Sequence, residues 1–182
     1  MARKITVANQ KGGVGKTTTA VNLSACLAVA EKRVLLVDFD PQANATSGMG
    51  IEKTEVQGSI YQCISDGCGL NEIVIDTEIN YLKLAPATID LVGAEVELVG
   101  SEGREYHLRR VLLEAEQDYD FVLIDSPPSL GLLTLNALTA ANEVIIPIQC
   151  EYYALEGLSQ LLQTIRMVQG SSNPDLKLGG VL

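Results

Sequence analysis

A glycine-rich stretch near the amino terminus carries the residue types that could bind a chain of phosphates. It reads Lys11-Gly12-Gly13-Val14-Gly15-Lys16-Thr17-Thr18 and stands between an apolar run and a helical pattern. Glycines let successive backbone N–H groups turn towards a phosphate, and a helix that starts there adds its positive dipole end. We expect Lys16 to contact the β- and γ-phosphates, the Thr17 hydroxyl to bind Mg²⁺, and Thr18 to bond the α-phosphate side. The stretch is the predicted nucleotide-binding loop.

This loop departs from the strict phosphate-loop pattern in two ways. The pattern G-x-x-x-x-G-K-[ST] would place its first glycine where the sequence has Gln10, and a second lysine, Lys11, precedes the glycines. The phosphates of one nucleotide do not require this additional cation. Lys11 is therefore either a solvated lysine in a glycine-rich turn or a cation with a further purpose.

Three aspartates follow apolar runs and are candidates for the chemistry of the site. Asp38 directly follows the run 34–37 and Asp40 stands two residues later, while Asp125 directly follows the run 121–124. In an open α/β sheet, ligands bind beyond the carboxyl ends of the strands, where these acids would emerge. We expect Asp125 to bind Mg²⁺ through a water on the side opposite Thr17. The alternative for each acid is a simple cap of the next turn.

Short apolar runs alternate with helical patterns along the chain. Strands are predicted at residues 5–8, 34–37, 82–85, 121–124, 144–148 and 178–182, and helices at 17–30 and 154–168. Several runs are apolar at consecutive positions, which is typical of parallel strands covered on both faces. The predicted fold is a single doubly wound α/β domain of the P-loop type over residues 1–182, with a mostly parallel sheet. Because no helix follows the last run, we expect the domain to lack its C-terminal part.

Bulk composition narrows the classes of function. Hydrophobic residues make up 47% and charged residues 20%, as in ordinary globular proteins. No apolar run reaches the roughly 18 residues of a membrane span. The formal net charge of −10 argues against a broadly basic DNA-binding surface. Arg104, Arg109 and Arg110 form one basic cluster, but apolar neighbours at helical spacing favour the solvated side of an amphipathic helix. These neighbours are Leu108, Val111, Leu112 and Ala115.

The cysteines do not form a metal-binding pattern. Cys26, Cys63, Cys68 and Cys150 include no Cys-x-x-Cys pair, and the sequence has one histidine, His107. Structural zinc is therefore not expected. We interpret the thiols as reduced, mostly packing residues of a cytoplasmic protein.

The loop sequence Lys-Gly-Gly-Val-Gly-Lys-Thr-Thr resembles the deviant Walker A motif of the ParA/MinD ATPases. In that family the earlier lysine crosses a dimer interface to the nucleotide of the partner, and the resemblance assigns this role to Lys11. Gly12 would then lie where two loops approach closely. The resemblance also implies that Asp40, in switch I, positions the attacking water. Asp38 would lie nearer the magnesium shell or hold nearby lysines.

Longer stretches are similar to partition ATPases. Residues 126–131 resemble switch II, which Pro127 and Pro128 would stiffen through their fixed φ angles. Residues 40–48 and 149–158 resemble the ParA/Soj proteins of chromosome or plasmid partition rather than MinD. Within the second stretch, Tyr152 and Tyr153 are expected to pack in the core.

The resemblance implies a complete ATPase cycle. It comprises binding of ATP or ADP with Mg²⁺, a homodimer formed on ATP binding, and weak hydrolysis until a ParB-like activator protein stimulates it. The full-length dimer would bind nonspecific DNA through a patch that lies beyond Leu182 in this family, as do the adenine-recognition residues. The expected location is the nucleoid of a bacterial or archaeal cytoplasm, without membrane association.

Three alternatives remain open from the sequence. A MinD-like, membrane-cycling regulator of cell division needs a C-terminal amphipathic helix, and the sequence shows none. A redox relative of the nitrogenase iron protein needs cysteines that meet across a dimer, and Cys63 and Cys68 do not resemble that placement. A pseudo-ATPase scaffold would be non-enzymatic, but Lys16, Asp40 and Asp125 are all intact.

Overall fold

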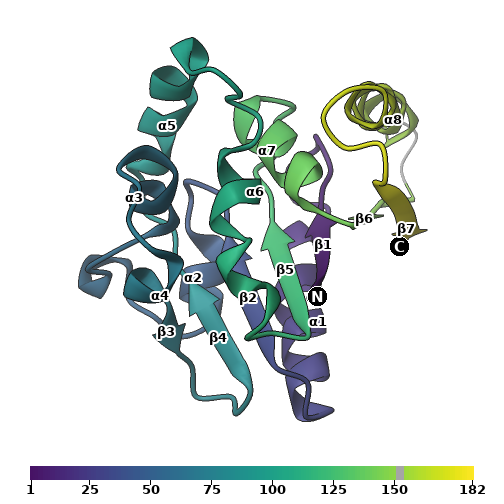
Figure 1. Ribbon diagram of the computed structural model, residues 1–182. Coiled ribbons are helices and arrows are strands. Elements are labelled where there is room, and N and C mark those ends of the chain that lie inside the picture. Colours follow the sequence, from purple (N-terminus) through teal and green to yellow (C-terminus); the bar gives the residue numbers. More distant parts are fainter. Residues whose placement is uncertain (151–153) are drawn as a thin grey trace.

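The computed structural model describes residues 1–150 and 154–182 and shows a seven-stranded sheet with helices packed against it (Figure 1). The strand order is β3-β4-β2-β5-β1-β6-β7. All neighbouring pairs are parallel except β3 and β4. The strands are β1 (Arg3–Val7), β2 (Val34–Asp38), β3 (Ile75–Asp76), β4 (Leu82–Ala85), β5 (Phe121–Asp125), β6 (Glu143–Ile146) and β7 (Lys177–Val181).

Eight α-helices connect or flank these strands in the described part of the chain. They are α1 (Lys16–Val29), α2 (Asn44–Gly48), α3 (Ile60–Ser65), α4 (Leu70–Ile73), α5 (Leu91–Glu97), α6 (His107–Val111), α7 (Leu132–Ala140) and α8 (Ala154–Gln169). Short 3₁₀ turns are η1 (Lys53–Glu55), η2 (Leu98–Gly100) and η3 (Glu114–Glu116). Helix α1 packs on one face of the sheet, α3 to α7 pack on the other, and α8 packs against α7 and β6. The doubly wound arrangement that the sequence predicts is confirmed.

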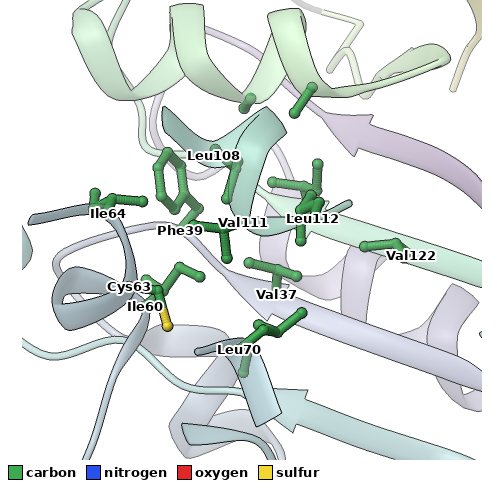
Figure 2. Close-up of a cluster of buried hydrophobic side chains, with 14 of the residues drawn as sticks. Val37, Phe39, Ile60, Cys63, Ile64, Leu70, Leu108, Val111, Leu112 and Val122 are labelled. Carbon is green, nitrogen blue, oxygen red and sulfur yellow. The ribbon is translucent and has the colours of Figure 1, made fainter. Parts of the chain in front are cut away.

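Strand β2 shows why the apolar runs are continuous. Leu35 and Val37 pack in the cluster under α3 to α7, whereas Val34 and Leu36 pack in the cluster with α1. Figure 2 shows the first cluster, in which Val37 lies among side chains from α3, α4 and α6. Successive side chains of a strand point to opposite faces. A strand covered on both faces must therefore be apolar at nearly every position.

The element boundaries agree closely with those predicted from the sequence. The six predicted strands correspond to β1, β2, β4, β5, β6 and β7, with ends shifted by no more than about two residues, as is usual for such boundaries. The predicted helices 17–30 and 154–168 correspond to α1 and α8. Strand β3, a short antiparallel edge strand, was not predicted.

The arginine cluster lies as its spacing indicates. Arg109 and Arg110 are exposed on α6, whereas Leu108 and Val111 on the same helix are buried. Arg104 is also exposed but precedes the helix. The interpretation as the solvated side of an amphipathic helix is confirmed for the two arginines that the helix contains.

The thiols divide into two pairs. Cys63 is buried and Cys68 packs partly buried against the same cluster, but Cys26 and Cys150 are exposed, so the packing interpretation is wrong for those two. Tyr152 and Tyr153, also expected in the core, lie outside the described residues. Among the described residues, no helix combines the length and apolar character that crossing a membrane requires.

Candidate functional site

Three neighbouring strands bring the predicted site residues to one end of the sheet. Val7 at the end of β1 pairs with Asp125 at the end of β5, and Asp125 pairs in turn with Asp38 at the end of β2. The loop 8–15 leaves β1 at this level, and α1 begins at Lys16. Open parallel sheets bind ligands beyond the carboxyl ends of their strands. The loop and both acids occupy that position.

The glycines of the loop bend its backbone and leave its outer side open. Gly13 and Gly15 have φ angles of 73° and 90°, a left-handed conformation that favours glycine. Gly15 is the N-cap of α1 and provides no side-chain cap. The first N–H groups of an uncapped helix remain available to a ligand. A Cβ atom at Gly12, Gly13 or Gly15 would meet nothing within 4 Å, so the loop faces open space.

Two side chains that the sequence analysis did not identify hold this loop. Asn9 accepts a hydrogen bond from Lys11 N at 3.0 Å and donates through Nδ2 to the Pro147 carbonyl at 2.7 Å. Gln149 donates through Nε2 to the Gly13 carbonyl at 3.0 Å. The loop is thus tied to the segment that follows β6. The only signal in the sequence was that Gln149 belongs to a stretch resembling partition ATPases.

Lys16 lies beneath the loop and close to the acids. Its side chain is largely buried, and Nζ donates to the Lys11 carbonyl at 3.0 Å. Burial lowers the pKa of Lys16, whereas the charges of Asp125 and Asp40 oppose this decrease. The lysine can therefore contact both the phosphate loop and the acidic end of the sheet.

Asp125 is fully buried, and neither carboxylate oxygen has a hydrogen-bond partner among the described residues. Burial raises the pKa of Asp125 to about 7, the Thr17 hydroxyl offsets part of this increase, and Asp38 and Asp40 add to it. Thr17 lies close enough to influence Asp125 but is not a hydrogen-bond partner of either carboxylate oxygen. Buried polar atoms without partners are rare in proteins. A carboxylate and a hydroxyl oxygen together suit Mg²⁺, so this pair fits the predicted metal.

Asp38 is also fully buried but has partners for both oxygens. Its Oδ2 accepts hydrogen bonds from Thr46 N and Thr46 Oγ1, both at 2.7 Å, and its Oδ1 accepts from Asp40 N at 3.3 Å. Burial raises the pKa of Asp38 to about 6, and the hydrogen bonds from Thr46 limit the increase. Asp38 thus ties α2 and the Asp40 loop to the end of β2. Direct binding of Mg²⁺ by Asp38 stays a prediction.

A cavity of about 310 Å³ lies in front of the loop. Its lining is Gly12, Gly13, Gly15, Lys16, Thr17, Thr18, Asp40, Gln42, Asn44 and Pro128. The structure therefore brings the phosphate loop together with the stretches that resemble switch I and switch II. Asp40 accepts a hydrogen bond from Gln42 N at 2.9 Å, in the loop after β2. Of the remaining predicted residues, Lys11, Val14, Asp38 and Asp125 lie outside this lining.

A larger cavity, of about 550 Å³, lies where β2, β4 and β5 begin, beside Arg33, Leu82 and Tyr119. It contains none of the predicted site residues. Neither Cys63 nor Cys68 lines the cavity at the loop, and burial raises the pKa of Cys63 to about 12. The predicted site residues therefore lie away from this larger cavity.

Comparison with known proteins finds relatives over nearly the whole chain. A family model described as an AAA domain matches residues 2–178. Soj of Bacillus subtilis, named a sporulation initiation inhibitor protein, is 58% identical over 182 residues, covering 100% of this chain and 72% of Soj. The chromosome partitioning protein ParA of Myxococcus xanthus is 57% identical over 182 residues, covering 100% of this chain and 64% of its own length.

Solved structures agree with the sequence relatives. A Mycobacterium smegmatis protein named cobyrinic acid a,c-diamide synthase, with a bound ATP analogue and magnesium, is 47% identical with a TM-score of 0.96, over 100% of this chain and 74% of its own. A plasmid partition protein from Borrelia burgdorferi is 30% identical with a TM-score of 0.85, over 99% of this chain and 78% of its own. With its deviant phosphate loop, its mostly parallel sheet and a similarity to Soj and ParA that covers all of its 182 residues, the chain belongs to the ParA/Soj family of partition ATPases.

Proposed function

We propose that residues 1–182 form one ATPase domain that binds ATP or ADP with Mg²⁺ in the cavity at the phosphate loop. The backbone of Gly12 to Thr18 and the Lys16 ammonium would hold the phosphates. Thr17 and Asp125 would hold Mg²⁺, and Asp38 would fix the loop that carries Asp40. The M. smegmatis structures with ADP or an ATP analogue and magnesium support this assignment.

The observation that carries the proposal is the unpartnered Asp125 carboxylate beneath an open glycine loop. Burying a carboxylate without donors is costly, and a protein keeps such a group where something else supplies the compensation. Mg²⁺, when bound, would supply positive charge to Asp125 and to the phosphates together. Thr17 and Lys16 both lie close enough to Asp125 to lower its pKa, so the hydroxyl would be available to the ion and the ammonium to the phosphates.

Hydrolysis would depend on positioning and on charge. Phosphoryl transfer requires little covalent chemistry from the protein beyond alignment of the nucleophile and stabilisation of charge. Asp40 lines the same cavity as the loop and would orient the attacking water. We propose that Lys11 reaches the nucleotide of a second subunit in a face-to-face dimer. The exposed Gly12 would lie at the contact between the two loops.

In the proposed cycle, ATP joins two subunits, the full-length dimer binds nonspecific DNA of the nucleoid in the cytoplasm, and a ParB-like activator stimulates the weak hydrolysis. The 57% and 58% identities to ParA and Soj support this role over membrane cycling of the MinD kind. The M. smegmatis relative is named a diamide synthase, but its identity is lower, at 47%. The similarities therefore favour DNA partition.

A substitution of Asp40 tests the catalytic assignment. Asp40→Ala should retain binding of MgATP and accumulate an ATP-bound dimer, because the phosphate loop is intact and only the orientation of water is lost. Phosphate release should fall by about 100-fold or more. Fluorescent-nucleotide binding, sedimentation and phosphate release measure the three properties. Asp118→Ala, which removes an exposed acid away from the cavity, is the matched control. Turnover by Asp40→Ala at the parental rate would contradict the proposal.

A further inference from the structure

The cavity of about 550 Å³ lies at the end of the sheet opposite the phosphate loop, where β2, β4 and β5 begin. We call it the second cavity. Pockets that bind small molecules in proteins have volumes of about 300–1,000 Å³, so the second cavity is large enough for one. The turn 77–81, which joins β3 to β4, contributes one of its walls. None of the residues assigned to nucleotide binding lines it.

The turn 77–81 is held in a fixed shape. The Thr77 hydroxyl donates to the Leu82 carbonyl at 2.8 Å and accepts from Ile79 N at 3.2 Å. Tyr81 has a φ angle of 67°, which residues other than glycine rarely adopt, and its carbonyl accepts from Val34 N at 2.8 Å. Strained backbone of this kind persists where its surroundings hold it, and it is frequent at ligand sites. This wall of the cavity is therefore formed without a ligand.

Tyr119 lines the second cavity with a hydroxyl that lacks a partner. The residue is 8% exposed, and its ring packs in the cluster under α3 to α7. Burial raises the pKa of Tyr119, Lys83 opposes the increase, and Asp118 and Asp76 add to it, so the hydroxyl lies near these charges and stays protonated at neutral pH. No described residue forms a hydrogen bond with it. Largely buried polar groups are normally paired, and a ligand acceptor would satisfy this donor.

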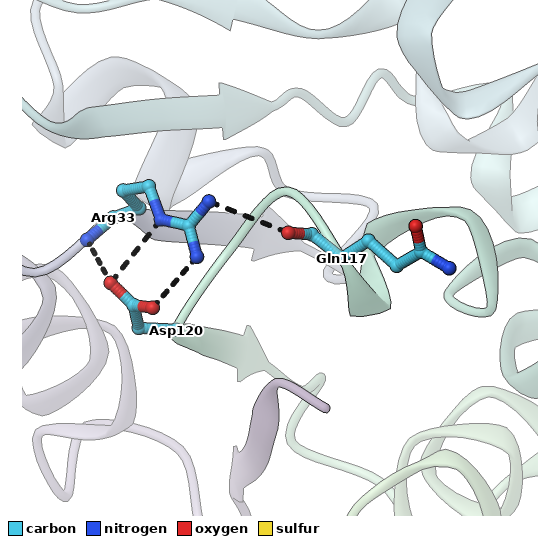
Figure 3. Close-up of polar contacts among 3 residues, drawn as sticks. All are labelled: Arg33, Gln117 and Asp120. Atoms are coloured by element: carbon cyan, nitrogen blue, oxygen red, sulfur yellow. Dashed lines mark hydrogen bonds and ion pairs between the residues drawn. The ribbon is translucent and has the colours of Figure 1, made fainter.

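The charged residues of the lining cancel one another. Arg33 and Lys83 are its described cations, and Asp76 and Asp118 are its described acids. Arg33 is already bound by Asp120, with Nη2 to Oδ1 at 2.9 Å (Figure 3), and Lys83 pairs with Asp76 at 3.0 Å. A phosphate or carboxylate would have to displace one of these acids. The lining therefore favours an uncharged ligand.

The uncharged groups of the lining indicate the kind of ligand. Asn71 and Asn80 are exposed, and their side-chain amides form no hydrogen bond with any described residue. An amide presents a donor beside an acceptor, which matches the edge of a nucleobase, as in the pairing of asparagine with adenine. The ring of Tyr81 is 55% exposed, and aromatic rings stack on bases of any sequence. Amides, a ring and a phenol donor together suit a planar nitrogen heterocycle.

We propose that the second cavity binds an uncharged nucleoside. Its base would lie against Tyr81 and bond the amides of Asn71 and Asn80, and one of its acceptors would receive the Tyr119 hydroxyl. This site is separate from the phosphate loop. The proposal is independent of the proposed ATPase function.

Titration with adenosine, followed by ligand-observed NMR, tests the site. Tyr119→Phe removes only the hydroxyl and should weaken binding about three- to tenfold. Asn71→Ala with Asn80→Ala changes exposed side chains and should weaken it about tenfold or more. Tyr106→Phe and Gln160→Ala, which lie outside the lining, are the matched controls and should bind as the wild type does. Wild-type affinity in either lining variant, or the absence of saturable binding, would overturn the proposal.

Charged analogues test the selection of an uncharged ligand. AMP adds a phosphate to adenosine, and an amine analogue carries an ammonium in place of the primary hydroxyl. Both should bind the second cavity more weakly than adenosine does when MgADP is present in excess, because the charges of the lining are already balanced. Equal or tighter binding of either analogue would show a site for a charged ligand and refute the proposal.

Competition with MgADP locates the adenosine. The affinity for adenosine should be the same with and without MgADP, since the second cavity and the phosphate loop lie at opposite ends of the sheet. Displacement of adenosine by MgADP would place it at the phosphate loop and contradict the proposal. Failure of MgADP to bind at all would instead count against the proposed function and leave the adenosine result standing.

Discussion

Asp125 links the stability of the protein to the chemistry of its site. Its pKa is raised from 3.8 to about 7, so the folded state holds a proton that the unfolded state releases. Stability should therefore fall as pH rises from about 4 to about 7 and level off above that. The carboxylate destabilises the fold at the pH where it would be needed to bind Mg²⁺.

Replacement of Asp125 by asparagine should separate these effects. In magnesium-free buffer at pH 8, Asp125→Asn should raise the free energy of unfolding by something of the order of 2 kcal/mol, because the buried charge is gone. At pH 4 the difference should be small. The dependence of ADP binding on Mg²⁺ should be lost. Chemical denaturation at both pH values and ADP titrations with and without Mg²⁺ measure these properties, and a destabilised variant at pH 8 would contradict the assignment.

Gly12 tests the close approach of two subunits. A Cβ at this position meets nothing within its own chain, so Gly12→Val should fold and bind nucleotide normally. It should fail to dimerise with ATP, because the added side chain would occupy the space of the facing loop. Sedimentation with MgATP and fluorescent-nucleotide binding measure the two outcomes. Gly180→Val, at a glycine that is also free of neighbours, is the matched control. If Gly12→Val still formed a normal ATP-dependent dimer, the proposed contact between two loops at Gly12 would be wrong.

The sequence could identify the residues whose type and spacing are characteristic of phosphate and metal binding. Lys16, Thr17 and Asp125 follow from the requirements of a phosphate chain and its metal at known spacing. Asn9 and Gln149 could not be identified in this way, because they bond backbone carbonyls of segments distant in sequence. Their types are common in loops, and only the folded chain shows what they hold.

At the scale of elements, hydrogen bonds of Thr46 connect helix α2 to the sheet. Thr46 is fully buried, donates twice to Asp38, and accepts a hydrogen bond from Ala87 N at 3.2 Å. It therefore connects α2, the end of β2 and the segment after β4. The Thr46 hydroxyl thus bonds both the end of β2 and the segment after β4.

Thr46→Val keeps the shape of the side chain and removes this hydroxyl. The loss leaves Ala87 N without its acceptor and Asp38 with one donor fewer, so the protein should lose about 1–3 kcal/mol of stability. Urea denaturation measures the change. The partly exposed Thr164 donates to the Gln160 carbonyl within α8 and provides the control Thr164→Val, which should change stability little. Equal losses of stability in Thr46→Val and Thr164→Val would show that the hydrogen bond to Asp38 contributes no more than a bond within a single helix.

The periodicity of the sequence predicted elements with a single apolar stripe or a continuous apolar run. Helices α1 and α8 and the long parallel strands belong to these classes. Helix α7 was not predicted, because it is buried on nearly all sides and shows no polar face. Helix α5 has two apolar faces, and β3 is too short for any period. These three elements depend on burial against distant parts of the chain, which the local sequence pattern does not reveal.

Across the whole molecule, a charged clamp joins the starts of β2 and β5 at the end opposite the phosphate loop (Figure 3). Arg33 donates from its backbone N to Asp120 Oδ2 and from Nη2 to Asp120 Oδ1, both at 2.9 Å. A further bond runs from Nη1 to the Gln117 carbonyl at 3.4 Å. Hydrogen bonds from Arg33 lower the pKa of Asp120 to about 2. The clamp depends on an ionised Asp120.

This shift predicts a pH-dependent contribution to stability. A lowered pKa stabilises the fold above the normal pKa of aspartate, near 4, and the stabilisation is lost as pH falls through about 2. Asp120→Asn should therefore lower the urea midpoint at pH 7, whereas wild type and variant should converge at about pH 2. The pair is partly exposed, so high salt should reduce the difference. Asp118→Asn is the control, and a loss that is equal at both pH values would contradict the role of charge.

The common level at which β1, β2 and β5 end also limits where the chain can change in length. Each of these strands has five residues, and their last residues pair across the sheet. One inserted residue in any of them would turn the following side chains to the opposite face, and in β2 or β5 it would carry the terminal aspartate away from its neighbours. The exposed turn 30–32 lies at the far end of α1 from the phosphate loop. A reporter peptide inserted there would lengthen the protein without altering the spacing on which its chemistry depends.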